Sequence, residues 1–133
     1  MDDVIQAKVA TIEKCLKRIQ EEASHDWKNN FTHQDALLLN LERACQAAID
    51  CALHIVRKKH LGLPKITREA FDLLNNAGII DSPISENMKK MVGFRNLAVH
   101  DYATLNLDIL EAILTRELTV FSSFCKTVIN LSL

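Results

Sequence analysis

Glycine and proline are scarce in this sequence, with three and two residues among 133. Both interrupt helices and mark turns, so their scarcity favours long helices. Charge of one sign is also lacking, since the formal net charge is −1, and this excludes a general nucleic-acid coat, which needs a basic field. Any RNA contact must use a local patch or a symmetric cleft built by two chains. The basic run at residues 57–60 is interpreted first as a solvated helix cap and second as a phosphate contact.

No cysteine pair has the CxxC spacing of a metal or redox site. The cysteines all lie in apolar stretches, where a thiol behaves as a small hydrophobe, and we expect reduced core residues at Cys15, Cys45, Cys51 and Cys125. No signal peptide is recognisable, and no apolar run approaches the ~20 residues of a membrane span. We therefore expect a cytoplasmic protein that does not contact a membrane.

The length suits one domain over residues 1–133, with enough chain to bury a core. Apolar residues recur at spacings of three and four. This pattern predicts helices over residues 2–23, 32–61, 67–77, 83–99 and 107–131, with no strand and no repeat. We therefore predict an all-α, up-and-down bundle of three long and two short helices.

Single residues mark the expected helix ends. Thr32 is the predicted N-cap of the second helix, and Gly62 is its predicted stop. Gly78 suits the position after the third helix. Ser82, which precedes a proline, and Asn106 are the predicted caps of the fourth and fifth helices.

Polar side chains gather at the end of the fourth predicted helix. Four hydrogen-bonding side chains fall within eight residues, namely Arg95, Asn96, His100 and Tyr102. Gly93, in mid-helix, costs ~1 kcal/mol relative to alanine and leaves room for a close approach. Packing alone would not choose these residues, so the segment is the candidate functional site.

Helix geometry limits how these side chains meet. Asn96 and His100 are four apart and share a face, as Arg95 and Tyr102 do if the helix continues. Arg95 and His100 are five apart and diverge by roughly 140° on an ideal helix. They converge only through the long arginine side chain, through a distorted helix end, or through a second copy of the protein. A two-fold dimer would bring two such ends together and double the positive charge.

These residue types suit metal-free RNA cleavage, in which the ribose 2′-OH attacks the adjacent phosphate. His100 can remove or supply a proton, because the unperturbed pKa of histidine is about 6.5. Arg95 can bind the phosphate and stabilise its extra charge. Asn96 can orient His100 or a phosphate oxygen, and Tyr102 can contact the phosphate or stack on a base. Spacing alone leaves open a plain alternative, in which Arg95 and His100 only cap carbonyls and Tyr102 is an ordinary surface ring.

The segment resembles the HEPN superfamily, whose motif is an arginine, a polar residue, three to five further residues and a histidine. Arg95, Asn96 and His100 match it. The narrower form, Arg-x4-His-x-Tyr, ends here at Tyr102 and is typical of the HepT toxins of HepT–MntA modules. The similarity covers nearly the whole chain and includes residues 93–96 and 106–108 and much of the first helix.

The resemblance implies a bundle that dimerises, with motif residues of both protomers lining one cleft. It implies the toxin of a type VII toxin–antitoxin system, a metal-independent endoribonuclease that needs no cofactor. Arg95 and His100 would be catalytic, with Asn96 and Asp101 in support. The implied partner is an MntA-type nucleotidyltransferase antitoxin that attaches AMP to Tyr102, which adds bulk and negative charge where the RNA phosphate must sit. The low net charge indicates a narrow RNA target, such as a tRNA.

Two other functions stay open from the sequence. One is a non-catalytic HEPN interaction module that binds nucleotide or a nucleotidyltransferase. The other is a metal site that uses Cys51 and His54, three apart on one helix face, although no second ligand pair has usable spacing. We expect no metal.

Overall fold

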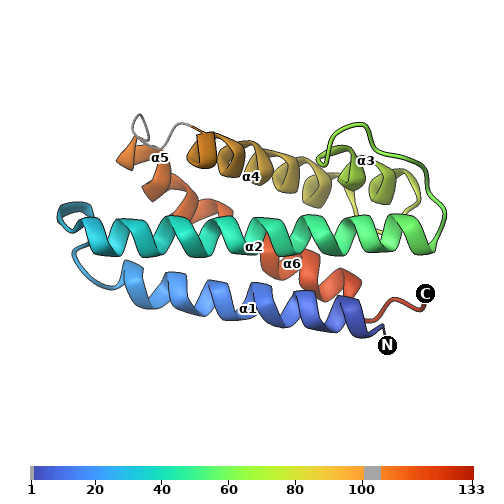
Figure 1. Ribbon diagram of the computed structural model, residues 1–133, viewed down its shortest axis with the longest axis horizontal. Helices are drawn as coiled ribbons and strands as arrows, with labels where there is room; N and C mark the ends of the chain where they lie inside the picture. The colour runs from blue at the N-terminus through green and yellow to red at the C-terminus, as the bar shows by residue number, and fades with distance from the viewer. Residues whose placement is uncertain (1, 101–105) are drawn as a thin grey trace.

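Helices make up most of the described chain (Figure 1). The computed structural model describes residues 2–100 and 106–133, and the side chains of these except at 97–100. The α-helices are α1 (Asp3–Ala23), α2 (Phe31–Lys58), α3 (Glu69–Asn76), α4 (Ser82–His100), α5 (Leu107–Ala112) and α6 (Thr119–Val128). A 3₁₀ turn, η1 (Trp27–Asn29), precedes α2, and a π-helical segment, η3 (Ile113–Glu117), follows α5. No strand occurs in these residues, so the predicted all-α class is confirmed.

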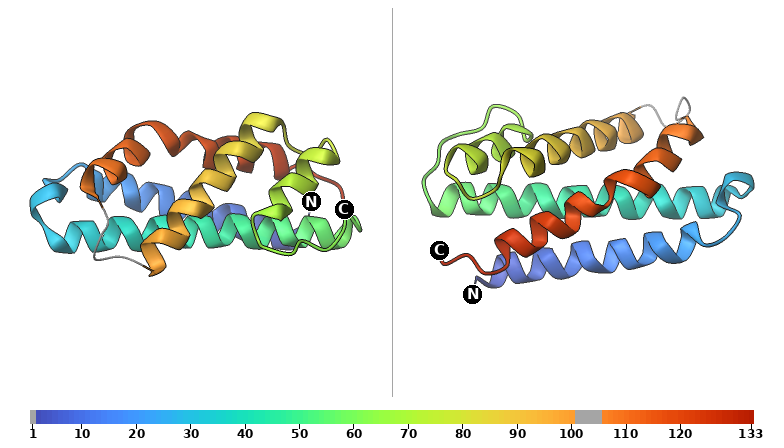
Figure 2. Two further views of the ribbon diagram at one scale, coloured as in Figure 1. Left: turned by 90° about the horizontal axis from the view of Figure 1, so that it is seen from above. Right: turned by 180° about the vertical axis from the view of Figure 1, so that it is seen from behind.

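The helices pack around α2, which is the longest at 28 residues. α1 lies antiparallel beside α2, and the two views of Figure 2 place α6 and the carboxyl end of α4 on opposite sides of α2. The two chain ends lie together at one end of the bundle. In this arrangement α2 packs against α1, α3 and α4, whereas α6 packs against α1 and α4.

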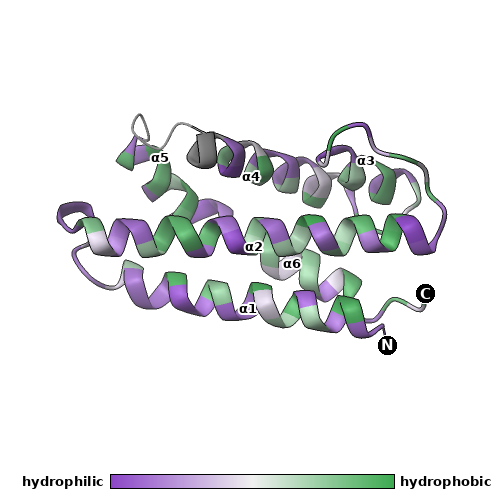
Figure 3. Cartoon of the chain, in the orientation of Figure 1, coloured by the Kyte–Doolittle hydropathy of each residue, from purple (hydrophilic) through white to green (hydrophobic). Residues whose placement is uncertain are grey.

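One-sided apolar stripes build the core. Hydrophobic and hydrophilic bands alternate along α1 and α2 (Figure 3), as expected for helices that bury one face. The buried stripe of α1 consists of Ile5, Val9, Ile12, Cys15 and Ile19. Small buried residues of α2, such as Cys45, Ala48 and Ala52, allow neighbouring helices to approach closely.

All four cysteines are free and buried, which confirms their prediction as reduced core residues. Burial raises the pKa of Cys45, Cys51 and Cys125 to about 12, so these groups stay as thiols near neutral pH. His54, the suggested metal partner of Cys51, instead bonds through Nε2 to Asp2 Oδ1 at 2.9 Å. Within residues 2–100 and 106–133, no three His, Cys, Asp or Glu side chains are grouped to hold a metal ion. Nor does any helix described here have the length and apolarity needed to cross a membrane.

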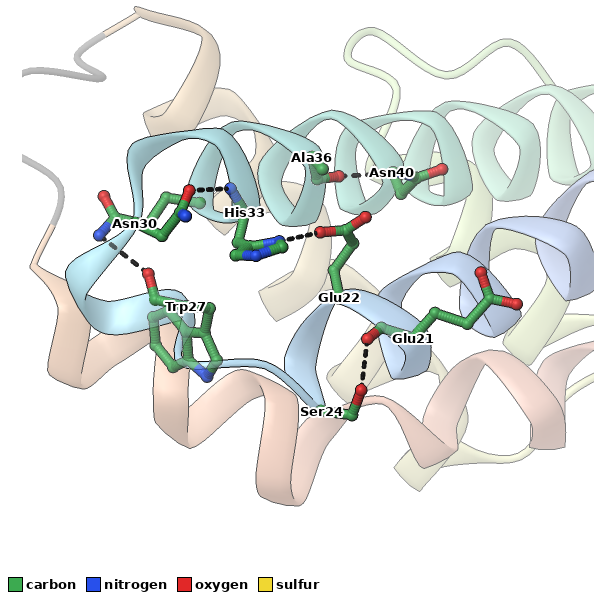
Figure 4. Close-up of polar contacts among 9 residues, drawn as sticks. Glu21, Glu22, Ser24, Trp27, Asn30, His33, Ala36 and Asn40 are labelled. Atoms are coloured by element: carbon green, nitrogen blue, oxygen red, sulfur yellow. Dashed lines mark hydrogen bonds and ion pairs between the residues drawn. The ribbon is translucent and has the colours of Figure 1, made fainter.

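The predicted start of α2 at Thr32 is wrong by two residues. Asn30 is the N-cap, and its side chain accepts a hydrogen bond from the His33 backbone N–H at 3.1 Å (Figure 4). Asn30 can cap the helix because its own backbone is extended (φ −137°, ψ 111°), which is the usual conformation of an N-cap residue. The His33 ring then contacts Glu22 at 2.5 Å, which ties the start of α2 to the end of α1.

The predicted end of α2 at Gly62 is also wrong, because the helix ends at Lys58. His60 takes the left-handed conformation there, with φ 54°. The His60 N–H donates to Arg57 O at 3.3 Å, and the Leu61 N–H donates to Val56 O at 3.0 Å. This pair of bonds is a Schellman motif, in which the left-handed residue is normally a glycine.

The His60→Gly substitution should therefore stabilise the protein. His60 is exposed, so little packing is lost, and relief of the left-handed strain should raise the unfolding free energy by ~1 kcal/mol. Chemical denaturation measures this change. The matched control is Lys59→Gly, where φ is −98°, which should destabilise. An equal loss of stability in both variants would contradict the assignment of left-handed strain to His60.

The other helix ends divide between confirmed and corrected predictions. Gly78 follows α3 with φ 76° and completes a second Schellman motif, as expected. α3 itself is shorter than the predicted 67–77. Ser82 is not the cap of α4, because Asp81 Oδ1 accepts from the Ile84 N–H at 2.9 Å and Ser82 is already helical. Asn106 caps α5, as predicted, by accepting from the Asp108 N–H at 2.7 Å.

The predicted continuous helix over residues 107–131 is interrupted. It consists of α5, the π-helical segment η3 and α6. The Thr115 hydroxyl donates to Glu111 O at 2.9 Å, and this carbonyl is the one that an α-helical Thr115 N–H would use. The described chain therefore has six α-helices rather than five, and α4, with 19 residues, is a long helix.

Candidate functional site

The site is organised by the crossing of α4 over α2 (Figures 1 and 2). Met88, Met91 and Val92 of α4 are buried in the core. At the crossing, the Cys45 thiol of α2 donates to Met91 O of α4 at 3.7 Å. A thiol is small, so it allows the two helix backbones to approach closely. This contact determines the distance between α4 and α2 at the crossing.

Arg95 is held at this crossing by two amide oxygens. Its Nη2 donates to Gln46 Oε1 of α2 at 2.6 Å, and its Nη1 donates to Asn96 Oδ1 at 3.0 Å. The Arg95 Nε is buried and has no hydrogen-bond partner among the described residues. Asn96 is thus placed against Arg95, whereas the sequence suggested that it would orient His100 or a phosphate oxygen.

Gln46 belongs to a chain of polar contacts that crosses three helices. Its Nε2 donates to Asp50 Oδ1 at 2.8 Å, and Lys8 of α1 pairs with Asp50 Oδ2 at 3.3 Å. Because the carboxylate takes the amide N–H, the amide oxygen is turned toward Arg95. Lys8 compensates the negative charge of Asp50. The Asp50 carboxylate therefore does not neutralise the positive charge of Arg95.

Both acceptors on Arg95 are therefore neutral. No carboxylate forms an ion pair with Arg95 in the described part of the chain. A guanidinium has five N–H donors, and two of them are used here. Arg95 therefore has two further Nη N–H groups and no described carboxylate beside its charge.

Sequence reasoning missed Gln46. The available signal was a glutamine and an aspartate four residues apart in the mostly apolar stretch at residues 44–56. Helix i,i+4 spacing predicts that Gln46 and Asp50 meet. Only the tertiary structure shows that Arg95, 49 positions along the chain, meets Gln46 as well.

The remaining predicted site residues are less fully described. His100 is the last residue of α4, and its side chain lies outside the described ones, as do Asp101 and Tyr102 entirely. The convergence of Arg95 with His100 therefore stays a prediction. At Gly93, a Cβ would lie 3.5 Å from Arg68 Nη1, an ordinary contact. A Cβ would therefore fit at Gly93, so the close approach expected there is not found among the described residues.

Comparison with known proteins identifies the family. A family model described as ribonuclease HepT-like matches residues 10–128. The mRNA nuclease HepT of Shewanella oneidensis is 48% identical over 126 residues, which cover 93% of this chain and 95% of that protein.

Solved structures of high similarity agree with this. The tri-AMPylated HEPN toxin of Shewanella oneidensis, in complex with an MNT antitoxin, has a TM-score of 0.94 and 45% identity, over 98% of this chain and 100% of that one. An MntA toxin–antitoxin mutant, in which one tyrosine is replaced by alanine, has a TM-score of 0.91 and 44% identity, over 97% and 100% of the chains. The fold is the all-α fold of these HEPN toxins. The chain belongs to the ribonuclease HepT-like family.

The amide clamp on Arg95 predicts the effect of changing Gln46. Gln46→Glu keeps an oxygen acceptor but places a carboxylate on Arg95. A carboxylate this close to Arg95 is worth roughly 1–4 kcal/mol, so ribonuclease activity should fall at least about fivefold at a temperature where both proteins are folded. The melting temperature should also fall, because Gln46→Glu replaces the N–H donated to Asp50 with a like charge. Initial cleavage rates and thermal melts measure the two effects. Gln20→Glu, an exposed change on α1, is the matched control. Full activity in Gln46→Glu would show that a neutral acceptor is not required.

Proposed function

We propose that this protein is the toxin of a type VII, HepT–MntA-like toxin–antitoxin system and acts as a metal-independent endoribonuclease. Arg95 and His100 are its catalytic residues. The observation that carries the proposal is the Arg95 guanidinium, held by two neutral amides in a chain 48% identical to an mRNA nuclease. The name of that relative favours mRNA as the substrate over the tRNA that the low net charge suggested.

The chemistry follows from the residue types. The ribose 2′-OH attacks the adjacent phosphorus in line, and the bond to the 5′-oxygen of the next nucleotide breaks. The products are a 2′,3′-cyclic phosphate and a 5′-hydroxyl. Arg95 binds the non-bridging oxygens through its remaining Nη N–H groups and stabilises the charge that builds up on them.

This reaction needs both a base for the 2′-OH and an acid for the leaving oxygen. One His100 imidazole cannot be both in the same step. A homodimer supplies two, and we propose that the site is completed by a second copy across a two-fold axis. Asn96 supports Arg95, and Asp101 is a further proposed supporting residue.

Regulation is proposed at Tyr102, the only tyrosine in the chain. An MntA-type nucleotidyltransferase would attach AMP to its hydroxyl. The adenylate brings bulk and a negative charge to a residue seven positions from Arg95, where it competes with the RNA phosphate. The AMPylated state of the HEPN toxin from Shewanella oneidensis supports this mode of control.

A non-catalytic interaction module is the alternative function. The complexes of similar toxins with a nucleotidyltransferase antitoxin fit this role as well. Expression of the chain alone in bacteria distinguishes the two functions, because only the ribonuclease should arrest growth and degrade RNA.

Arg95→Ala and His100→Ala should each lower RNA cleavage at least about 100-fold, as losses of transition-state contacts do. Both should abolish growth arrest and leave the helical circular dichroism unchanged. Wild-type activity should persist in EDTA, because no metal takes part. Controls are Arg57→Ala and His60→Gly, which alter the same residue types at exposed positions on or just after α2. Wild-type cleavage by purified His100→Ala would remove His100 from the mechanism.

Tyr102→Phe should prevent AMPylation. After incubation with ATP, Mg²⁺ and a cognate nucleotidyltransferase, mass spectrometry should find adenylate on the wild type and none on the variant. The unmodified variant should still cleave RNA in the presence of the antitoxin enzyme and ATP. Adenylate found on any other residue of Tyr102→Phe would refute the acceptor assignment.

A further inference from the structure

A second cationic site lies in a groove between α1 and α2, away from the Arg95 crossing. The groove has a volume of about 420 Å³. Its lining includes Thr11, Lys14, Cys15, Arg18, Asn40 and Arg43. Lys14, Arg18 and Arg43 are exposed, and none of the three forms an ion pair with a described residue.

None of the described residues that line this groove is a carboxylate. Of the acidic residues of α2 near the groove, Asp50 pairs with Lys8. Glu42 does not line the groove, and its charge contributes to the raised pKa of the buried Cys45 thiol. Asp35 has an interaction of its own. The groove lining therefore carries three cationic side chains and no described carboxylate, in a protein whose net charge is −1.

Cations from both helices line the groove around the Cys15 thiol, with Lys14 on α1 and Arg43 on α2. Burial raises the pKa of the Cys15 thiol, and the charges of Arg43 and Lys14 both act in the opposite direction. Arg18 lies one turn beyond Lys14, about 6 Å along the helix axis.

The groove opens on the flank of the bundle that is not covered by α6. Val9, Glu13 and Leu16 mark the flank of α1 that shares a cavity with α6. The groove residues of α1 lie on its opposite flank, which also carries Lys8, the partner of Asp50. The carboxyl end of α4 projects past α2 on the side away from α6 as well (Figure 2).

The groove and Arg95 are connected through α2. Arg43 and Gln46 are three residues apart, so they lie on neighbouring positions of one face, about 4.5 Å apart along the axis. Gln46 holds Arg95 at 2.6 Å. The groove therefore lies one helix position from the residue that holds Arg95.

We propose that the α1–α2 groove is a phosphate-binding subsite for single-stranded RNA, which holds the strand that flanks the phosphate bound by Arg95. This inference rests on the proposed ribonuclease function and names the local patch that a chain of net charge −1 requires for RNA. Phosphates bound by Lys14, Arg18 and Arg43 fix the register of the strand without reading its sequence.

Binding of a short 2′-O-methyl RNA, which lacks the attacking hydroxyl and cannot be cleaved, tests the subsite. Fluorescence anisotropy over a range of salt concentrations should show a several-fold higher Kd for Arg43→Gln and for Arg18→Gln. Each substitution should reduce the slope of log K against log salt by about 0.7, the value for one lost phosphate contact on a single strand. With cleavable RNA, the defect should appear in KM.

Arg57→Gln and Lys17→Gln are the matched controls, because both remove one exposed positive charge from α2 or α1 outside the groove. Their Kd and salt slope should stay at wild-type values. If the controls changed Kd and salt slope as much as the groove variants do, the effect would come from net charge alone, and the subsite would be overturned.

Other outcomes also overturn the subsite. Wild-type Kd and slope in the double variant Arg18→Gln, Arg43→Gln would do so directly. Weakened binding of ATP with unchanged binding of RNA would assign the groove to a nucleotide. A shift of the variants to smaller species in sedimentation, with unchanged RNA binding, would assign it to contact between copies of the chain. Because the RNA probe is not cleaved, loss of the catalytic proposal would leave this binding test intact.

Discussion

The close packing of α4 across α2 is the contact on which the arrangement of this protein depends. It requires a small residue on α2 where the helices meet, and Cys45 meets the Met91 carbonyl there. The buried apolar face of α4 then determines which of its side chains emerge toward α2. Arg95 emerges beside Gln46, and the rest of the polar site is built around that meeting.

Neutral acceptors define the chemistry of this site. A carboxylate would hold a guanidinium more strongly but would cancel the charge that a phosphate needs. Gln46 and Asn96 position Arg95 and leave its charge intact. Asp50 orients the Gln46 amide, and Lys8 balances Asp50, so the negative charge is kept one residue away from the arginine.

A net charge of −1 and an RNA substrate are compatible because the charge is distributed unevenly. Acidic residues are paired at several places, as in Lys28 with Glu111 and Lys89 with Asp72. The cations of the α1–α2 groove have no such partners among the described residues. The net charge averages over paired and unpaired regions of the surface, whereas a bound RNA strand contacts only the local surface.

The sequence by itself determined the helical class, the buried cysteines, the Gly78 stop and the Asn106 cap, because these depend on periodicity and on residues next to one another. It also identified the motif segment and the HepT-like family through the order of Arg95, Asn96, His100 and Tyr102. Predictions failed where several residues compete for one role. Asn30 displaced Thr32 and Asp81 displaced Ser82 as caps, and His60 ended α2 before Gly62 was reached. The clamp on Arg95 and the α1–α2 groove were decided only by the tertiary structure, because both join side chains far apart in sequence that meet only when helices pack.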